Sequence, residues 1–136
     1  MNEEIFQFHH TGYAVPDIDR AARALEALGW QAEGVICPDA ERKIRIAFCR
    51  RGGALIELVE PAAADSPVSA LLKKNGPAPY HLCYAVAAQN AAAARKILAE
   101  KGFALLLRDA PAPALQGRNV AFYYSKDLGL TEILWL

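Results

Sequence analysis

The chain of 136 residues carries no excess of charge of either sign, because 15 Lys and Arg residues balance 15 Asp and Glu residues. Proteins that bind nucleic acid usually present clustered basic charge to the phosphate backbone. The sequence also has no apolar run of the roughly 18 residues that a membrane helix needs, and its acidic N-terminus is unlike a secretory signal. We therefore expect neither nucleic acid nor a membrane as a partner.

Cysteine is scarce, with Cys37, Cys49 and Cys83 alone in the sequence and no C-x-x-C motif. An odd number at this spacing predicts neither a disulfide framework nor a structural zinc site built from thiolates. This usage favours a reducing compartment, and we predict a cytoplasmic protein. Hydrophobic residues make up 54% of the chain, so one domain of this length can bury a core without cross-links.

Two similar segments open the two halves of the chain. Residues 10–15 read HTGYAV and residues 81–86 read HLCYAV. Each is followed by a helical pattern that ends at Gly and an aromatic residue, then by a strand carrying Ala-Phe, and finally by an apolar strand that contains a glutamate. Repetition of this order predicts a duplicated β-α-β-β-β module.

We accordingly predict the α+β class, with two tandem βαβββ modules in a single domain over residues 1–136. The modules are expected at about 5–62 and 79–136, joined by a linker helix at about 65–76. Ser66 and Pro67 are typical of a helix start, and Asn75-Gly76 of a helix end. The Pro/Ala stretch at 110–114 predicts a loop.

Each module offers one histidine at its start and one glutamate near its end. A lone His or Glu in a strand is usually structural, but a buried carboxylate needs a partner, and here the same need recurs in both modules. Packing of the modules about a pseudo-twofold axis would bring the four together. Two imidazoles and two carboxylates suit a divalent ion such as Zn, Ni, Co or Mn. The predicted metal ligands are His10, Glu57, His81 and Glu132.

The neighbours of the two histidines receive structural interpretations. His9 points to the opposite face from His10 if the strand is regular. Cys83 lies on the face of His81, and a small core residue is the favoured interpretation for it.

Short motifs spread over nearly the whole chain carry a family resemblance. They lie at 9–18, 56–61, 65–67, 74–76, 80–82 and 117–122. Together they resemble the vicinal oxygen chelate superfamily, which includes glyoxalase I, extradiol dioxygenases, bleomycin-binding proteins and methylmalonyl-CoA epimerase, and they are most similar to the epimerase branch. The resemblance implies a glyoxalase-like fold, with a cupped mixed sheet around a metal, and a homodimer. By position it places the metal ligands on His10, Glu57, His81 and Glu132.

The function implied by the resemblance is stabilisation of the enolate of a small acyl thioester by a divalent metal, as in methylmalonyl-CoA epimerase. Glu132 is the candidate for the carboxylate that moves the proton. An epimerase needs a second acid/base, and the position of that glutamate in the resembling enzymes falls near Gly34. Glu33 is one place away and Glu41 lies in the following turn, so strict epimerase activity stays open.

Two alternatives remain at this point. One is a glyoxalase I (lactoylglutathione lyase) activity on a hemithioacetal substrate, with Glu57 as a second catalytic base. The other is a metal-free protein that binds a small molecule and confers resistance. A basic group around the third strand provides candidates for binding a CoA phosphate: Arg42, Lys43, Arg45, Arg50 and Arg51.

Overall fold

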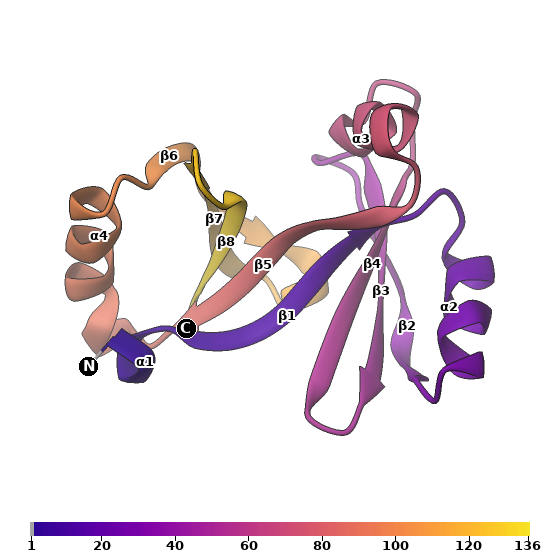
Figure 1. Ribbon diagram of the computed structural model, residues 1–136, viewed down its shortest axis with the longest axis horizontal. Helices are drawn as coiled ribbons and strands as arrows, with labels where there is room; N and C mark the ends of the chain where they lie inside the picture. The colour runs from indigo at the N-terminus through magenta and orange to yellow at the C-terminus, as the bar shows by residue number, and fades with distance from the viewer. Residues whose placement is uncertain (1) are drawn as a thin grey trace. The chain divides into compact units, whose positions relative to one another are not determined.

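The computed structural model describes residues 2–136, which form two compact units (Figure 1). The N-terminal unit comprises residues 10–80, and the C-terminal unit comprises residues 2–9 together with 81–136. The elements are α1 (Asn2–Ile5), β1 (Gln7–Ala14), α2 (Ile18–Ala27), β2 (Gln31–Asp39), β3 (Ile44–Arg51), β4 (Ala54–Pro61), α3 (Pro67–Asn75), β5 (Ala78–Val86), η1 (Ala88–Asn90), α4 (Ala91–Glu100), β6 (Ala104–Ala112), η2 (Pro113–Leu115), β7 (Arg118–Ser125) and β8 (Gly129–Trp135).

The two units share one strand topology. In the N-terminal unit the strand order is β2-β3-β4-β1, and in the C-terminal unit it is β5-β8-β7-β6. The first strand of each module pairs parallel to the last, β1 with β4 and β5 with β8. The remaining pairs are antiparallel. The predicted α+β class and the repeated β-α-β-β-β order are therefore confirmed.

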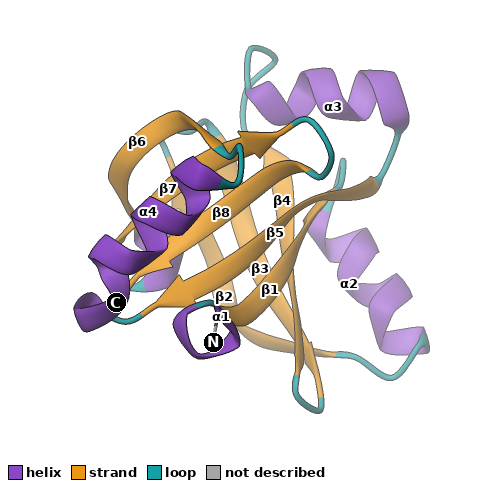
Figure 2. Cartoon of the chain, turned by 60° about the vertical axis from the view of Figure 1, so that its left-hand side comes forward, coloured by secondary structure: helices purple, strands orange, loops and turns teal. Residues whose placement is uncertain are grey.

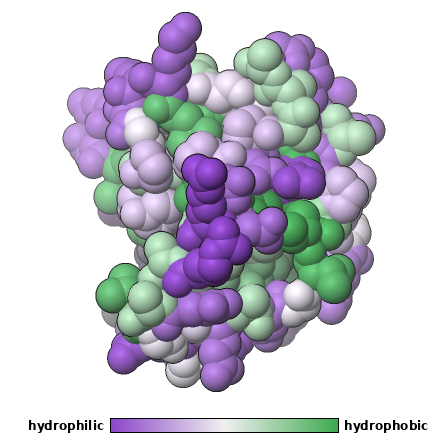
Figure 3. All heavy atoms as spheres, turned by 90° about the vertical axis from the view of Figure 1, so that its right-hand side faces the viewer, coloured by the Kyte–Doolittle hydropathy of each residue, from purple (hydrophilic) through white to green (hydrophobic). Residues whose placement is uncertain are grey.

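Helix α2 covers one face of the N-terminal sheet. Its N-cap is Asp17, whose carboxylate accepts the Arg20 backbone N–H at 2.9 Å. Gly29 follows the helix with φ +93°, a conformation that glycine adopts without strain. Figure 3 views the protein from the side on which α2 lies in Figure 1. Hydrophilic side chains run across the middle of the surface seen in that view. The core beneath the helix is formed by Val15, Ile18, Cys49 and Leu58.

Glu60 ties the start of α2 to the sheet. Its side chain is buried, and it accepts the Ile18 N–H at 2.9 Å and the Arg45 Nε–H at 2.7 Å. We expect Glu60→Ala to lower the free energy of unfolding by about 2 kcal/mol, because a buried helix N–H and a guanidinium lose their acceptor. Urea denaturation measures this loss. The control is Glu41→Ala in the exposed turn, for which a change within about 0.5 kcal/mol is expected; equal losses in both variants would contradict the role given to Glu60.

Helix α4 packs on the C-terminal sheet in the same way, and Figure 2 shows it lying across β7 and β8. Ala94 and Leu98 of the helix join Ala121, Tyr123 and Ile133 of the strands in one buried cluster. Among residues 2–136, no helix combines the length and the apolar character that crossing a membrane requires.

The prediction of a loop at 110–114 is wrong for its first half. Strand β6 continues to Ala112, with Ala110 opposite Val120 and Pro111 opposite Asn119. A short 3-10 helix at residues 113–115 follows. Because β6 is the last strand of its sheet, the missing N–H of Pro111 breaks no ladder on its outer side, and proline is tolerated there.

The three cysteines are free thiols of unequal accessibility. Cys49 and Cys83 are buried, and Cys37 is partly exposed. Burial raises the pKa of the Cys49 thiol, and the Glu26 carboxylate raises it further. We expect an aromatic disulfide reagent at pH 8 to modify Cys37 more than about tenfold faster than the other two, since the thiolate is the reactive form. Equal rates for all three thiols in the folded protein would contradict this prediction; the expected cytoplasmic location stays a prediction.

Candidate functional site

In the N-terminal unit, His10 and Glu57 lie on the sheet face turned away from α2. Glu57 is opposite Gly12 on β1, and alternate residues of a strand share a face, so His10 is on the side of Glu57. Leu58, the next residue, belongs to the core under α2. Both residues are buried, at 0% and 3% exposure, and His10 Nε2 lies 3.5 Å from Glu57 Oε2.

In the C-terminal unit, His81 and Glu132 repeat this arrangement. Glu132 is opposite Cys83 on β5, and His81 is two residues before Cys83. Ile133, on the other face of β8, packs in the cluster with α4. His81 Nε2 lies 3.2 Å from Glu132 Oε1, and each residue is 4% exposed.

The two pairs have the donor chemistry of a divalent-metal site. Bonds of about 2.0–2.2 Å from an ion to histidine nitrogen or carboxylate oxygen place two adjacent ligands roughly 3.0–3.5 Å apart. The distances of 3.5 Å and 3.2 Å within the pairs fit this spacing. A buried carboxylate also needs a hydrogen-bond donor, a cation or a metal ion beside it. Each unit thus brings together the histidine and the glutamate that the sequence predicts for it.

A phenylalanine accompanies each pair, and neither was among the residues predicted for the site. Phe48 is opposite Glu57 on the neighbouring strand and meets the His10 ring edge-on, with centroids 5.9 Å apart. Phe122 is opposite Glu132 and meets the His81 ring in the same way at 5.5 Å. These contacts fix each imidazole ring plane from one side. The repeated Ala-Phe dipeptides were the signal that could have identified them.

The positions considered for a second acid/base have different environments. Glu33 is opposite Phe48, which is opposite Glu57, so Glu33 lies on the same sheet face as the first metal-type pair. Its carboxylate is 2.9 Å from Arg50 Nε. Gly34 has φ +75° at a register shift in β2, and Glu41 is exposed in the turn after it. Because Glu33 shares a sheet face with Glu57, it is a better candidate for the second acid/base than Gly34 or Glu41.

Four members of the basic group around β3 are ion-paired, which leaves little charge for a phosphate. The pairs are Arg42 with Asp39, Lys43 with Asp65, Arg45 with Glu60 and Arg50 with Glu33. The hydrogen bond from Lys43 lowers the pKa of Asp65. Within residues 2–136, Arg51 is the member of the group with no carboxylate within 4.0 Å.

Comparison with known families agrees with the observed fold. The model of the Glyoxalase/Bleomycin resistance protein/Dioxygenase superfamily matches residues 9–122, a span that includes His10, Glu57 and His81. The chain belongs to this superfamily.

Its similar relatives include epimerases of acyl-CoA thioesters. The mitochondrial methylmalonyl-CoA epimerase of Mus musculus is 32% identical over 125 residues, covering 90% of this chain and 68% of that protein. The ethylmalonyl-CoA/methylmalonyl-CoA epimerase of Cereibacter sphaeroides is 30% identical, covering 90% and 91%. A solved methylmalonyl-CoA epimerase in complex with methylmalonyl-CoA and NH4+ superposes with a TM-score of 0.78 at 26% identity, covering 96% and 94%.

Proposed function

We propose that this protein is a metal-dependent epimerase of a small acyl-CoA thioester whose α carbon carries an acidic proton, as in methylmalonyl-CoA. One observation supports it most: a buried His–Glu pair on the first and last strands of both units, in a chain about 30% identical to enzymes named for this reaction.

We further propose that the two pairs act together, so that His10, Glu57, His81 and Glu132 hold one divalent ion, Zn, Ni, Co or Mn. The mixed nitrogen and oxygen donors are typical of a site for such an ion. A closed structural zinc site would instead favour thiolates. When bound, the ion supplies a Lewis acid for the charge that develops on the thioester carbonyl oxygen. We also propose that the protein forms a homodimer and that residues 1–136 form a single domain.

Glu132 is the proposed general base. Its carboxylate removes the α proton as the carbonyl oxygen gains negative charge, and a proton returned to the opposite face of the enolate inverts the centre. Glu33 is the candidate for the group that returns the proton, because it lies on the same sheet face as Glu57. The two residues are two strands apart, so the strand spacing puts their Cα atoms at roughly 10 Å. Phe48 lies between them on β3.

The test is incubation of metal-loaded protein with methylmalonyl-CoA of one configuration in deuterated water, followed by NMR and chiral analysis. Deuterium at the α carbon together with racemisation supports the epimerase. Exchange with retained configuration would mean that one base serves one face and that Glu33 does not act. Absence of exchange with each of the four metals, with a rise in thioester absorbance from a glutathione hemithioacetal, would support the lyase activity instead.

A further inference from the structure

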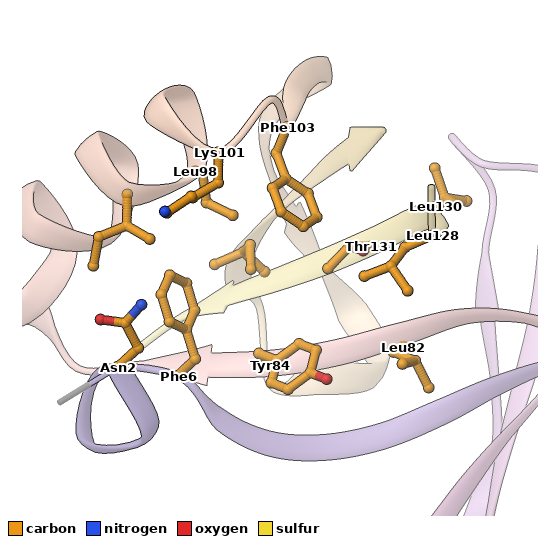
Figure 4. A pocket seen from close by; sticks show the side chains of 12 residues that line it. Asn2, Phe6, Leu82, Tyr84, Leu98, Lys101, Phe103, Leu128, Leu130 and Thr131 are labelled. Atoms are coloured by element: carbon orange, nitrogen blue, oxygen red, sulfur yellow. The ribbon is translucent and has the colours of Figure 1, made fainter. Parts of the chain in front are cut away.

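A hydrophobic cavity of about 290 Å³ lies in the C-terminal unit, among α1, α4, β5 and β8 (Figure 4). Its walls are mostly aromatic and aliphatic. Phe6, Leu82, Tyr84, Leu98, Phe103 and Ile133 are among the side chains that line it. Ligand pockets are concave, apolar and marked by a few polar groups, and this volume is at the lower end of their range.

The cavity is on the opposite side of β5 and β8 from His81 and Glu132. Leu82 and Tyr84 line it, and they alternate with His81 and Cys83 along β5. Since successive side chains of a strand point to opposite faces, a molecule in the cavity does not touch the His–Glu pair. The cavity is therefore a separate site.

One cation stands at the edge of this apolar space. Lys101 follows the last turn of α4 and lines the cavity. In the part of the chain that is described, no carboxylate lies within 4.0 Å of its ammonium group. Figure 4 shows its nitrogen on the side of the cavity where Asn2 and Phe6 lie. An apolar chamber with one unneutralised cation is complementary to an anion that carries a hydrocarbon chain.

We propose that this cavity binds a small amphiphilic carboxylate: a short or medium acyl chain in the apolar space, with its terminal carboxylate on Lys101. The limited volume favours such a chain over a long-chain lipid. The site is independent of the proposed epimerase activity, because it uses none of the four metal-type residues.

Calorimetric titration of the full chain with octanoate, and with 1-octanol as a neutral analogue of equal length, tests this proposal. We expect octanoate to bind about tenfold more tightly than octanol, since a charge-assisted contact adds to the apolar one. Lys101→Met should remove that difference. The matched control is Lys96→Met, at an exposed position of the same helix that does not line the cavity, and it should keep it.

Two filling variants check the location. Ile97→Trp and Leu130→Trp each place a bulky side chain at a partly exposed wall of the cavity, and each folded variant should lose more than about tenfold in octanoate affinity. The proposal is overturned by no binding of octanoate to the unmodified protein, by equal binding of octanol and octanoate, or by full affinity in both folded filling variants. α-Proton exchange in the same samples reports on the proposed epimerase separately.

Discussion

Alanine at His10 or at His81 is expected to remove the bound divalent ion and to slow α-proton exchange by more than about a hundredfold. Losing a group that merely orients a metal ligand already costs 10–100-fold, and each of these imidazoles is a proposed ligand. Since the two pairs are equivalent, the two variants should suffer alike. Elemental analysis of the purified proteins and exchange measured by NMR provide the two readings.

The matched control is His9→Ala, at the neighbouring position of β1, because His9 is not one of the four proposed ligands. It should keep both the ion and the exchange. The proposal that the two pairs share one ion predicts one ion per chain in the unmodified protein. Two ions per chain, or unchanged metal content in His10→Ala, would contradict the shared site.

Mixing the His10→Ala and His81→Ala variants shows whether the two His–Glu pairs of one site come from the same chain or from two copies. If the pairs meet within one chain, a mixture of His10→Ala and His81→Ala stays inactive. If they meet between two copies, one composite site in a mixed dimer has all four residues, and part of the exchange returns. Size-exclusion chromatography of the same mixture reports whether dimers are present.

Glutamine at Glu132 is expected to abolish proton transfer while leaving much of the metal affinity. The amide keeps an oxygen beside His81 Nε2, where the carboxylate oxygen now lies at 3.2 Å, but it cannot accept the α proton. General acid/base groups contribute about 10²–10⁴-fold, and exchange in deuterated water should fall by that amount at saturating metal.

Glu57→Gln is the counterpart in the other unit. If Glu132 alone is the base, this variant retains most of the exchange at equal metal content. Comparable losses in both variants would assign base character to both glutamates, as the lyase hypothesis implies for Glu57. Full exchange in Glu132→Gln would rule out Glu132 as the base.

The sequence predicted the topology and singled out the four residues that form the two His–Glu pairs, because both depend on local pattern. Period-2 and period-3.6 hydrophobicity locates strands and helices, and repetition of His and Glu at matching places in two modules marks them as a set. The pairing within each unit follows from the fixed parallel register of the first and last strands.

Other features depend on tertiary neighbours that a linear pattern does not reveal. The sheet face on which Glu33 lies depends on its pairing with Phe48 and on the irregularity that follows at Gly34. Three of the basic residues around β3 pair with carboxylates 15 to 22 residues away in the sequence, such as Lys43 with Asp65. The cavity beside Lys101 is built from separate segments, two of them nearly a whole chain length apart.

Pro111 has a consequence for how copies of the protein meet. The outer strand β6 exposes Leu105, Leu106 and Leu107 at 52–59%, and an apolar strand with a free edge is prone to pair with another strand. Proline at the end of β6 and two register irregularities before it interrupt the row of N–H donors. We expect this interruption to disfavour continuous β6-to-β6 addition and the fibrous growth that it would permit.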